Sequence, residues 1–586
     1  MPRQPAPHGQ EWLILHGRSG GFHRAATAVV LRDICPQSTA PCLALRSDDG
    51  RTLMQRTSLS LAAAAAATVL GAVTAVPGAQ AVPQPPSAVR PQPPSAIRPL
   101  QQSAPPVTTT VAHGVTVTSM AFGRQAADDP WTVHVYLPVD PDGPLSSANT
   151  ALGPRATADR VAAALRDKGF EPRVEEVWTP SYADLRAGSL GWTVRIGRYA
   201  QEAGASADLA RVKAAGFTGG TRYLPQDGTD FRAPQKVHVM RVDFAAFRGS
   251  LDTDFGPTLN GTEKLTDLMA AAGATAGVNA QWFYNNAPGG LYVKDGRLIG
   301  SATQGRAGIR FSGGGRTFDV DTFRARVTLS AGGATAEIDG VNRVPGDVWN
   351  CGGVGGDLPT EKPQHDVKCT DDSELVRFTP EWGQPPAGAG AEAVLDADGT
   401  VTAVNTSRGA RVPAGGSTIQ ATGASAAWLL EHVRQGGTAT VTEEVRDSRG
   451  LKVALTPDTT ILQVGPSLVR DGRVSVNAVG DGIVRQGPDQ TFTYNWTVRA
   501  NPRSMIGVDD RGRLLLVVVD GRQAGYSEGL GVAQAAQLMR QLGAREAMNL
   551  DGGGSSVMAT ARTGIVNRPS DSTGQRSLGT VLLLRP

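Results

Sequence analysis

The chain has 586 residues, enough for about two to four domains, and its 40% hydrophobic and 19% charged residues are typical of a largely globular protein. The formal net charge is only +3 and no basic run stands out, which argues against a nucleic-acid-binding protein. The 71 glycines and 39 prolines favour many turns and strands over long helices.

The N-terminal part of the chain contains a pattern typical of export. A basic residue, Arg56, precedes a run of small and apolar residues over 59–76, and Ala79-Gln80-Ala81 is an A-x-A cleavage pattern. We predict a signal peptide over 54–81 and interpret 1–53 as a doubtful extension before the true start, a genuine extension being the alternative. The apolar run is short and mostly alanine, so we expect cleavage, no stable membrane span, and a secreted, extracellular protein.

Cleavage after residue 81 would leave two cysteines, Cys351 and Cys369, in the exported chain. Export favours oxidation of thiols, and the segment between the two cysteines is polar and loop-like. We therefore expect a disulfide that staples this loop. Two separate thiols are the alternative, because a sequence does not show the geometry that a disulfide requires.

Residues 83–98 are a tandem octapeptide, PQPPSAVR followed by PQPPSAIR. Proline at this density favours extended polyproline II structure and cannot build a core. We therefore predict a proline-rich linker over 82–126, which acts as a spacer that holds the later domains away from a surface.

A weak internal repeat follows over 127–230. WTVHV, ADRVAAALRDKGF and RVEEV in the first half correspond to WTVRI, ADLARVKAAGF and TRYL in the second, and each half reads strand, helix, strand. Two such halves fit a ferredoxin-like domain. The segment WTVRIGRYAQEAGASADLARVKAAGF also resembles the SPOR family, whose members bind glycan strands of peptidoglycan. This resemblance implies a wall-associated protein with peptidoglycan as a partner; a generic packing or docking domain is the alternative.

From residue 236 onward the sequence changes to short strands separated by glycine-rich turns. KVHVMRVDF alternates along its length, and turns such as Asp398-Gly399 and Asp471-Gly472 interrupt the strands. The clearest helices are LTDLMAAAG, AAWLLEHVRQGG and GVAQAAQLMRQLG. We predict an α+β protein in which the ferredoxin-like SPOR-type domain is followed by a larger mixed-sheet domain over 236–586.

Two apolar runs each end in an aspartate that is followed by glycine. LLLVVVD ends in Asp520, and AMNLD contains Asn549 and ends in Asp551. This pattern is expected for buried strands that place a carboxylate at their tip. The turn Gly552-Gly553-Gly554 would let backbone N–H groups approach an anion, and Ser555 adds a hydroxyl group. We interpret this turn as a cradle for phosphate oxygens. For Asp520, a turn-capping role is the alternative.

Arginines near these turns would supply positive charge. Arg503, Arg522 and Arg568 lie in NPRS, DGR and NRPSD, and Arg576 is a further candidate. A guanidinium group suits a planar, bidentate grip on phosphate, whereas a solvated surface charge is the alternative for each arginine alone. We predict that Arg503, Arg522 and Arg568 bind the substrate.

Four segments, taken in order, resemble the phosphodiester glycosidase family: GVNAQWFYNNAPGGLYVKDGRLIG, VGPSLVRDGRV, residues 501–558, and VNRPSDSTGQRSLGTVLLL. The family includes an enzyme that removes N-acetylglucosamine from a phosphodiester. The resemblance spans 236–586. It implies a phosphodiester glycosidase domain, and hence a hydrolase that takes a glycan or sugar-phosphate substrate and cleaves the glycosidic bond of a sugar-1-phosphodiester. The substrate would be similar to an N-acetylglucosamine-1-phosphodiester or would be a cell-wall polymer.

Cleavage at the anomeric carbon expels a phosphate monoester, which is a weak base and needs little help from a general acid. A carboxylate is needed as nucleophile or as base for water, and we predict Asp551 first, then Asp520, with Glu528 as a lesser candidate. Retention or inversion depends on the carboxylate separation, which the sequence leaves open. Asn279, with the aromatic residues 282–284, is predicted to form the sugar side of the site.

The sequence lacks the motifs of other kinds of catalytic or metal-binding site. The chain contains no HExxH or CxxC sequence, and none of the histidines after residue 81 lies in the four segments. We expect no cofactor, with a divalent cation shared by Asp551 and phosphate as the open alternative. Two other functions also stay open: a non-catalytic cell-envelope protein that binds glycans, and a phosphodiesterase that breaks the P–O bond.

Overall fold

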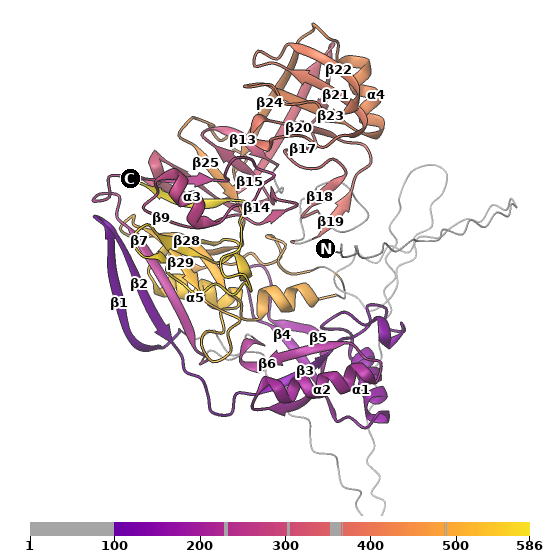
Figure 1. Cartoon of the computed structure of the whole chain (residues 1–586), viewed down its shortest axis with the longest axis vertical. Helices are drawn as coiled ribbons and strands as arrows, with labels where there is room; N and C mark the ends of the chain where they lie inside the picture. The colour runs from indigo at the N-terminus through magenta and orange to yellow at the C-terminus, as the bar shows by residue number, and fades with distance from the viewer. Residues whose placement is uncertain are drawn as a thin grey trace, which may run out of the picture. The chain divides into compact units, whose positions relative to one another are not determined.

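The computed structural model describes residues 99–227, 232–301, 305–351, 365, 367–485, 487 and 489–586 (Figure 1). The predicted extension, signal peptide and tandem octapeptide lie outside these residues. The described residues belong to one compact unit. No helix in the described part of the chain has both the length and the apolarity needed to cross a membrane.

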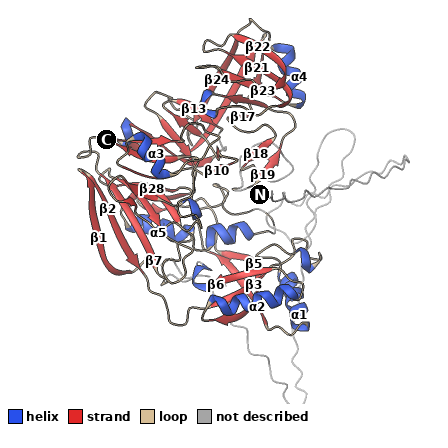
Figure 2. Cartoon of the chain, in the orientation of Figure 1, coloured by secondary structure: helices blue, strands red, loops and turns tan. Residues whose placement is uncertain are grey.

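An antiparallel eight-stranded sheet forms the centre of this unit (Figure 2). LLLVVV forms its strand β29, in which every residue is buried. The predicted apolar strand is therefore present, with Asp520 immediately after it. Across the sheet the strands are β1 (Gln102–Ala112), β2 (Val115–Phe122), β7 (Gln235–Val242), β29 (Leu514–Val519), β28 (Arg503–Asp509), β30 (Ala544–Asn549), β26 (Ser467–Arg470) and β27 (Arg473–Val474).

Both faces of β29 are covered, which explains why its sequence is apolar without alternation. Leu515, Val517 and Val519 share a core with helix α5 (Val532–Gln541). Residues on the opposite face, such as Leu516, share a core with a second, five-stranded sheet. In order, the strands of that sheet are β32 (Gly564–Ile565), β31 (Met558–Thr560), β9 (Ala276–Asn279), β33 (Val581–Arg585) and β8 (Ser250–Asp254).

The structure differs from the predicted linker over 82–126, because β1 and β2 form a hairpin within that range and join the central sheet. Strand β2 pairs with β7 along its whole length, from Val115 opposite Val242 to Phe122 opposite Gln235. The prolines end at Pro106, and the residues that follow are rich in threonine and valine. β-Branched residues favour strands, so the proline-rich composition applies only to the first part of the range.

The predicted ferredoxin-like domain is confirmed. Its strands are all antiparallel and lie in the order β4-β5-β3-β6, and both helices cover one face. The domain is inserted between β2 and β7, which are neighbours in the central sheet. Its elements are β3 (Trp131–Val135), α1 (Arg155–Asp167), β4 (Pro172–Thr179), β5 (Gly188–Tyr199), α2 (Glu202–Ala214), β6 (Gly219–Tyr223) and the short 3₁₀ helix η2 (Leu224–Asp227).

The remaining elements lie mostly between residues 265 and 463 and include the other two predicted helices, α3 (Leu265–Ala272) and α4 (Gly423–His432). One sheet has the order β13-β12-β25-β14-β15-β16, with β24 also paired to β15, and another has the order β17-β20-β23-β21-β22. The strands of these sheets are β12 (Tyr292–Lys294), β13 (Arg297–Gly300), β14 (Arg306–Ser312), β15 (Thr317–Ala331), β16 (Ala334–Glu337), β17 (Gly340–Val341), β20 (Leu375–Phe378), β21 (Gly388–Leu395), β22 (Val401–Arg408), β23 (Ser417–Ala421), β24 (Ala439–Arg446) and β25 (Thr460–Gln463). Strands β10 (Phe283–Tyr284) and β11 (Ala287–Pro288) form a separate two-stranded pair.

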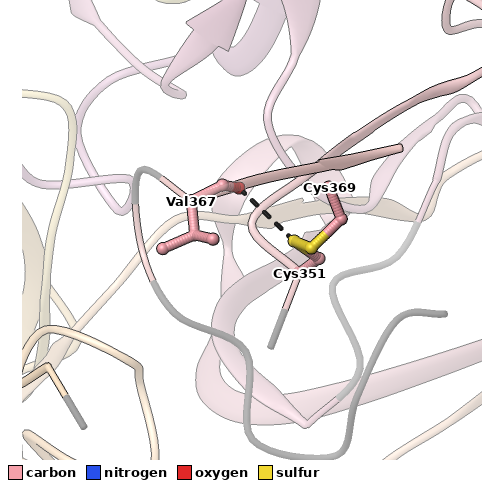
Figure 3. The surroundings of a disulfide bond; sticks show 3 residues. All are labelled: Cys351, Val367 and Cys369. Atoms are coloured by element: carbon pink, nitrogen blue, oxygen red, sulfur yellow. Dashed lines mark hydrogen bonds between the residues drawn. A yellow bond between two sulfur atoms is a disulfide. The ribbon is translucent and has the colours of Figure 1, made fainter. Parts of the chain in front are cut away.

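Cys351 and Cys369 form the predicted disulfide, with their Cα atoms 6.0 Å apart (Figure 3). The bond lies beside the antiparallel pair β18 (Asp347–Trp349) and β19 (Lys368–Thr370). The carbonyl oxygen of Val367 is 3.8 Å from the Cys351 sulfur. The disulfide therefore ties the two ends of the intervening segment to this strand pair.

Candidate active site

The sheet topology brings the predicted site residues to one edge. Strands β29 and β30 end where the antiparallel strand β28 begins, because Arg503 lies opposite Val519 and Met505 lies opposite Asn549. Asp520 and Asp551 follow the ends of β29 and β30. Strand β9 of the second sheet ends at Asn279, and a hydrogen bond from this residue to the backbone of Asp551 joins the two sheets at the same edge.

Asn279 fixes the turn that carries Asp551. Its Nδ2 donates to the Asp551 carbonyl oxygen at 2.7 Å, and its Oδ1 accepts from the Ser504 hydroxyl at 2.6 Å and from the Val557 N–H at 3.1 Å. The Asp551 N–H donates to the Ala280 carbonyl oxygen at 2.9 Å. Asn279 is fully buried, so this network holds the backbone of the turn in place. Asp551 itself is partly exposed.

The Asp551 carboxylate is held in an environment that brings its titration towards neutral pH. Burial raises the pKa of Asp551 to about 6. The Ser555 hydroxyl, the Gly552 N–H and the charges of Arg576 and Arg522 favour the ionised form and limit the rise. A carboxylate with a pKa near 6 is a stronger base than an ordinary aspartate and is still ionised at pH 7.

The triple-glycine turn leaves room for guanidinium groups. Its N–H groups are largely used internally, since Gly552 donates to the Asp551 carboxylate and Gly553 donates to the Pro502 carbonyl oxygen. The predicted backbone cradle is therefore mostly occupied. A Cβ at Gly553, where φ is +60°, would lie 3.2 Å from Nη2 of Arg522, and a Cβ at Gly554 would lie 2.5 Å from Nη2 of Arg576.

Arg522 and Arg576 are both solvent-exposed and flank the turn. The guanidinium group of Arg522 donates twice to Oδ1 of Asn501, at 3.0 and 2.9 Å, and has no carboxylate partner among the described residues. Arg576 pairs with Asp571 at 2.9 Å. Two exposed guanidinium groups beside one partly exposed carboxylate suit an anion that lies against a nucleophile or base.

A model of the phosphodiester glycosidase family matches residues 389–585, and a model of the SPOR domain matches residues 150–223. Residues 389–585 therefore carry a phosphodiester glycosidase domain. An exported protein from Burkholderia pseudomallei K96243 has a solved structure with 30% identity and a TM-score of 0.73, covering 84% of this chain and 99% of that one. No curated protein sequence matches the chain.

Two more distant structures are also similar to this chain. A protein from Synechocystis has 16% identity and a TM-score of 0.47, covering 82% of this chain and 75% of that one. The zebrafish N-acetylglucosamine-1-phosphodiester α-N-acetylglucosaminidase catalytic domain, auto-inhibited by its pro-peptide, has 13% identity and a TM-score of 0.29, covering 78% of this chain and 88% of that one. Neither likeness is strong enough to inform the site.

Asp520 of the glycosidase domain is in a different environment from Asp551. Its side chain is fully buried. Oδ1 accepts from Nδ2 of Asn567 at 3.0 Å and from the Arg568 N–H at 2.9 Å, while Oδ2 accepts from the Tyr526 hydroxyl at 3.2 Å. Nε2 of His238 lies 3.4 Å from Oδ2. The carboxylate is therefore saturated, and it holds the 567–568 segment in place.

Arg503 and Arg568 also differ from each other. Arg503 is fully buried, donates through Nε to the Leu530 carbonyl oxygen and through Nη2 to that of Trp496, and stacks over the Trp496 ring at 4.7 Å. Burial and the charge of Arg522 lower the pKa of Arg503 to about 9. The Arg568 side chain is exposed, with its guanidinium carbon 5.0 Å from the Tyr526 ring centroid.

Glu528 and Asn549 lie behind the exposed part of the site. Glu528 is fully buried and accepts from Nε2 of Gln226 at 2.9 Å and from the Gly525 N–H at 2.7 Å. Burial raises the pKa of Glu528 to about 7. Asn549 is also fully buried and donates to the Gly465 carbonyl oxygen at 3.3 Å. Ser555 is 1% exposed, next to Arg576.

The aromatic residues of the predicted sugar side are engaged with other rings. Trp282 is 5% exposed and stacks on His365 at 3.7 Å, and Tyr284 stacks on Trp349 at 3.9 Å. The structure thus buries Trp282, whereas Phe283 and Tyr284 are both half-buried.

The sequence analysis missed two amides, Asn501 and Asn567, which orient Arg522 and Asp520. Each asparagine lies one or two residues before a predicted arginine, in NPRS and NRPSD. This repeated pattern could have identified both asparagines as site residues. Among the described residues, no group of three or more histidine, cysteine, aspartate or glutamate side chains is arranged to hold a metal ion.

Proposed function

We propose that the chain is a secreted hydrolase that cleaves the glycosidic bond of sugar-1-phosphodiesters. The family match supports this reaction class. The observation that carries the proposal is the placement of Asp551, a partly exposed carboxylate with a pKa near 6, between the exposed arginines Arg522 and Arg576. The disulfide and the exported relative support export.

In this mechanism Arg522 and Arg576 bind the phosphate oxygens of the substrate. The bond between the anomeric carbon and the bridging oxygen breaks, and its electron pair leaves with the phosphate monoester, which the two guanidinium groups neutralise. Asp551 attacks the anomeric carbon or takes a proton from the water that attacks it. No general acid is required, because the leaving group is a weak base.

The other predicted residues have positioning roles in this proposal. Asn279 holds the Asp551 turn through its backbone, and Asp520 holds the 567–568 segment. Arg503 binds the two carbonyl oxygens beneath the edge of the sheet, and Glu528 lies against η2 of the SPOR domain. We therefore assign the chemistry to Asp551 and the organisation of its surroundings to these buried groups.

The reaction is tested with the purified protein and the methyl phosphodiester of N-acetylglucosamine 1-phosphate, in both anomeric forms. We expect release of free sugar, entry of ¹⁸O from labelled water into the sugar, and loss of release in Asp551→Asn. Asp510→Asn is the matched control, because Asp510 is an exposed aspartate in the turn between β28 and β29. Absence of release, or an active Asp551→Asn variant, would refute the proposal; ¹⁸O in the phosphate would show P–O cleavage instead.

The stereochemistry of the released sugar separates the two roles of Asp551. A base for water gives one displacement and inversion, whereas a nucleophile gives a glycosyl–enzyme intermediate and retention. Proton NMR of the fresh product distinguishes the two anomers before they equilibrate.

A second candidate function is glycan binding without catalysis, which the SPOR match favours. It predicts that the purified protein sediments with peptidoglycan and releases no sugar from any phosphodiester. The two candidates therefore differ in the release assay, even if both bind the wall.

A further inference from the structure

An aromatic cluster next to the candidate active site holds a buried arginine. Trp282 stacks on His365 with ring centroids 3.7 Å apart, and both rings lie edge-on to Trp496, at 5.9 and 4.9 Å. Trp496 belongs to the π-helical segment η5 (Thr493–Val498). The guanidinium carbon of Arg306, the first residue of β14, lies 5.1 Å from the Trp282 ring centroid. We call this contiguous group the Arg306 cluster: Arg306, Trp282, His365 and Trp496.

The Arg306 cluster adjoins the Asp551 turn at two points. The carbonyl oxygen of Ala280, two residues before Trp282, accepts from the Asp551 N–H at 2.9 Å. The guanidinium carbon of Arg503 lies 4.7 Å from the Trp496 ring centroid, and a Cβ on the first glycine of the triple-glycine turn would lie 4.0 Å from Cδ of Arg503. The cluster and the turn are therefore neighbouring parts of the same edge of the fold.

The nitrogen atoms of the cluster are buried without hydrogen-bond partners. Arg306 is fully buried, and Nε, Nη1 and Nη2 of its guanidinium group donate to no atom of the described residues. Nε1 of Trp282 and both ring nitrogens of His365 are buried without partners in the same part of the structure. Burial and the charge of Arg306 lower the pKa of His365 well below its usual range, so its ring is neutral and one nitrogen is an N–H donor. The cluster therefore has an excess of buried donors, and the group that would complete it is a hydrogen-bond acceptor.

Asp481 favours the charge on Arg306 without bonding to it. Oδ1 of Asp481 accepts from the Ala307 N–H at 2.8 Å, and Oδ2 accepts from the Ser467 N–H at 3.2 Å. Among the described residues, no carboxylate oxygen accepts a hydrogen bond from Arg306. Burial outweighs the influence of Asp481 and lowers the pKa of Arg306 to about 10, which leaves the guanidinium group charged at pH 7. A buried charge of this kind is unfavourable, and a bound oxyanion would supply both the acceptor and the opposite charge.

We propose that Arg306 anchors a buried oxyanion subsite beside the Asp551 turn. Trp282 and His365 border the subsite and offer further N–H donors. A carboxylate or phosphate group is the class of ligand, because the guanidinium fork suits the paired oxygens of both. In the substrate this group is a substituent of the sugar, since Trp282 belongs to the segment predicted to form the sugar side; this assignment rests on the proposed function, in which the two exposed arginines bind the scissile phosphate. The preferred substrates are then sugar-1-phosphodiesters whose sugar carries an acidic substituent.

Binding of inorganic phosphate tests the subsite independently of catalysis. By calorimetry at low salt, where charge interactions are least screened, we expect Arg306→Met to lose a phosphate site that the wild-type protein has. Arg306→Lys should bind phosphate there roughly tenfold more weakly, since an ammonium group cannot form the bidentate contact. Arg511→Met is the matched control, because Arg511 is exposed in the turn between β28 and β29 and its loss removes the same charge. Without phosphate, Arg306→Met should also melt at a higher temperature than wild type, because an unpaired buried charge is removed.

The outcomes of this experiment separate the subsite from the proposed function. A phosphate site that is lost in Arg306→Met and kept in Arg522→Gln supports the subsite, whether or not the protein releases sugar. An Arg306→Met protein that binds as much phosphate as wild type, with the same affinity, would refute it. If Arg306→Met does not fold, unchanged affinity in Arg306→Lys is the refuting result.

The sugar-release assay tests the assignment of the oxyanion to the sugar. It compares the methyl phosphodiesters of N-acetylglucosamine 1-phosphate and of glucuronic acid 1-phosphate, of which only the second has an acidic sugar. We expect wild type to have the higher kcat/KM for the second substrate and Arg306→Gln to lose roughly tenfold of this preference, since a guanidinium–carboxylate contact is charge-assisted. Arg511→Gln should keep the preference. No preference in wild type, or a preference that survives in Arg306→Gln, would overturn the assignment to the sugar.

Discussion

Replacement of Asp551 by asparagine should stabilise the protein while it abolishes activity. An aspartate ordinarily titrates near pH 3.9, whereas burial raises the pKa of Asp551 to about 6. The folded protein therefore binds this proton more tightly than the unfolded chain does. One pKa unit corresponds to about 1.4 kcal/mol, so the ionised carboxylate lowers the free energy of unfolding by at most about 3 kcal/mol.

The pH dependence follows from the direction of this change. The folded state has its full stability well below pH 4, where Asp551 is protonated in both states, and loses stability as the pH rises from about 4 through 6. Asparagine stays neutral, and its Oδ1 can still accept from the Gly552 N–H. The difference in unfolding free energy between Asp551→Asn and wild type should therefore be near zero at pH 4 and reach its plateau above pH 6.

Urea denaturation followed by circular dichroism, at intervals from pH 4 to pH 8, measures this difference. Asp510→Asn serves again as the control, and we expect it to change stability little because Asp510 is exposed. A difference that does not vary with pH, or an Asp551→Asn protein that is less stable than wild type at pH 7, would refute the reasoning. In the wild type, kcat/KM should rise with pH through about 6, as the carboxylate becomes ionised.

Other predictions concern the support of the site. Asp520→Asn should lower the free energy of unfolding by about 1–3 kcal/mol in urea denaturation, because the hydrogen bonds from Asn567 and Arg568 lose their charge-assisted acceptor and an NH2 group replaces the oxygen that accepts from the Tyr526 hydroxyl. Gly553→Ala should reduce kcat/KM in the sugar-release assay and cost about 1 kcal/mol of stability, since φ is +60° there and the new Cβ would displace a guanidinium group. Removal of the Cys351–Cys369 disulfide, by a double serine variant or by reductant, should lower the free energy of unfolding by about 3 kcal/mol, as expected for a loop of 18 residues.

The sequence predicted the general class of the fold and the residues at the sheet edge. Apolar runs such as LLLVVV identify buried strands because both of their faces need apolar partners, and the structure places Asp520 and Asp551 after two such strands. The internal repeat likewise predicted the ferredoxin-like domain, because its hydrophobic positions recur within short segments. Each of these patterns lies within a short segment, so it can be recognised in a single sequence.

The sequence did not predict that the two aspartates lie in different environments. Asp520 and Asp551 both follow an apolar strand and precede a glycine. Only Asp520 meets the backbone and side chain of residues 567–568, which lie far along the chain. The glycines of the second turn were predicted to expose N–H groups, yet their main effect is to admit two arginine side chains that approach from elsewhere in the fold. Contacts between distant segments decide both outcomes.

The insertion of the SPOR domain between β2 and β7 has a consequence for how the protein is made. During synthesis the inserted domain is complete soon after residue 223, because its strands pair only with one another. The central sheet is completed much later, because β7 pairs with β29, which begins at Leu514. A chain that stops early would thus keep a folded SPOR domain beside a β7 that is paired with β2 but open on the edge that β29 normally covers. An open strand edge invites aggregation or proteolysis. We therefore expect the protein to resist aggregation and proteolysis only after its last 75 or so residues have been made and β29 has paired with β7.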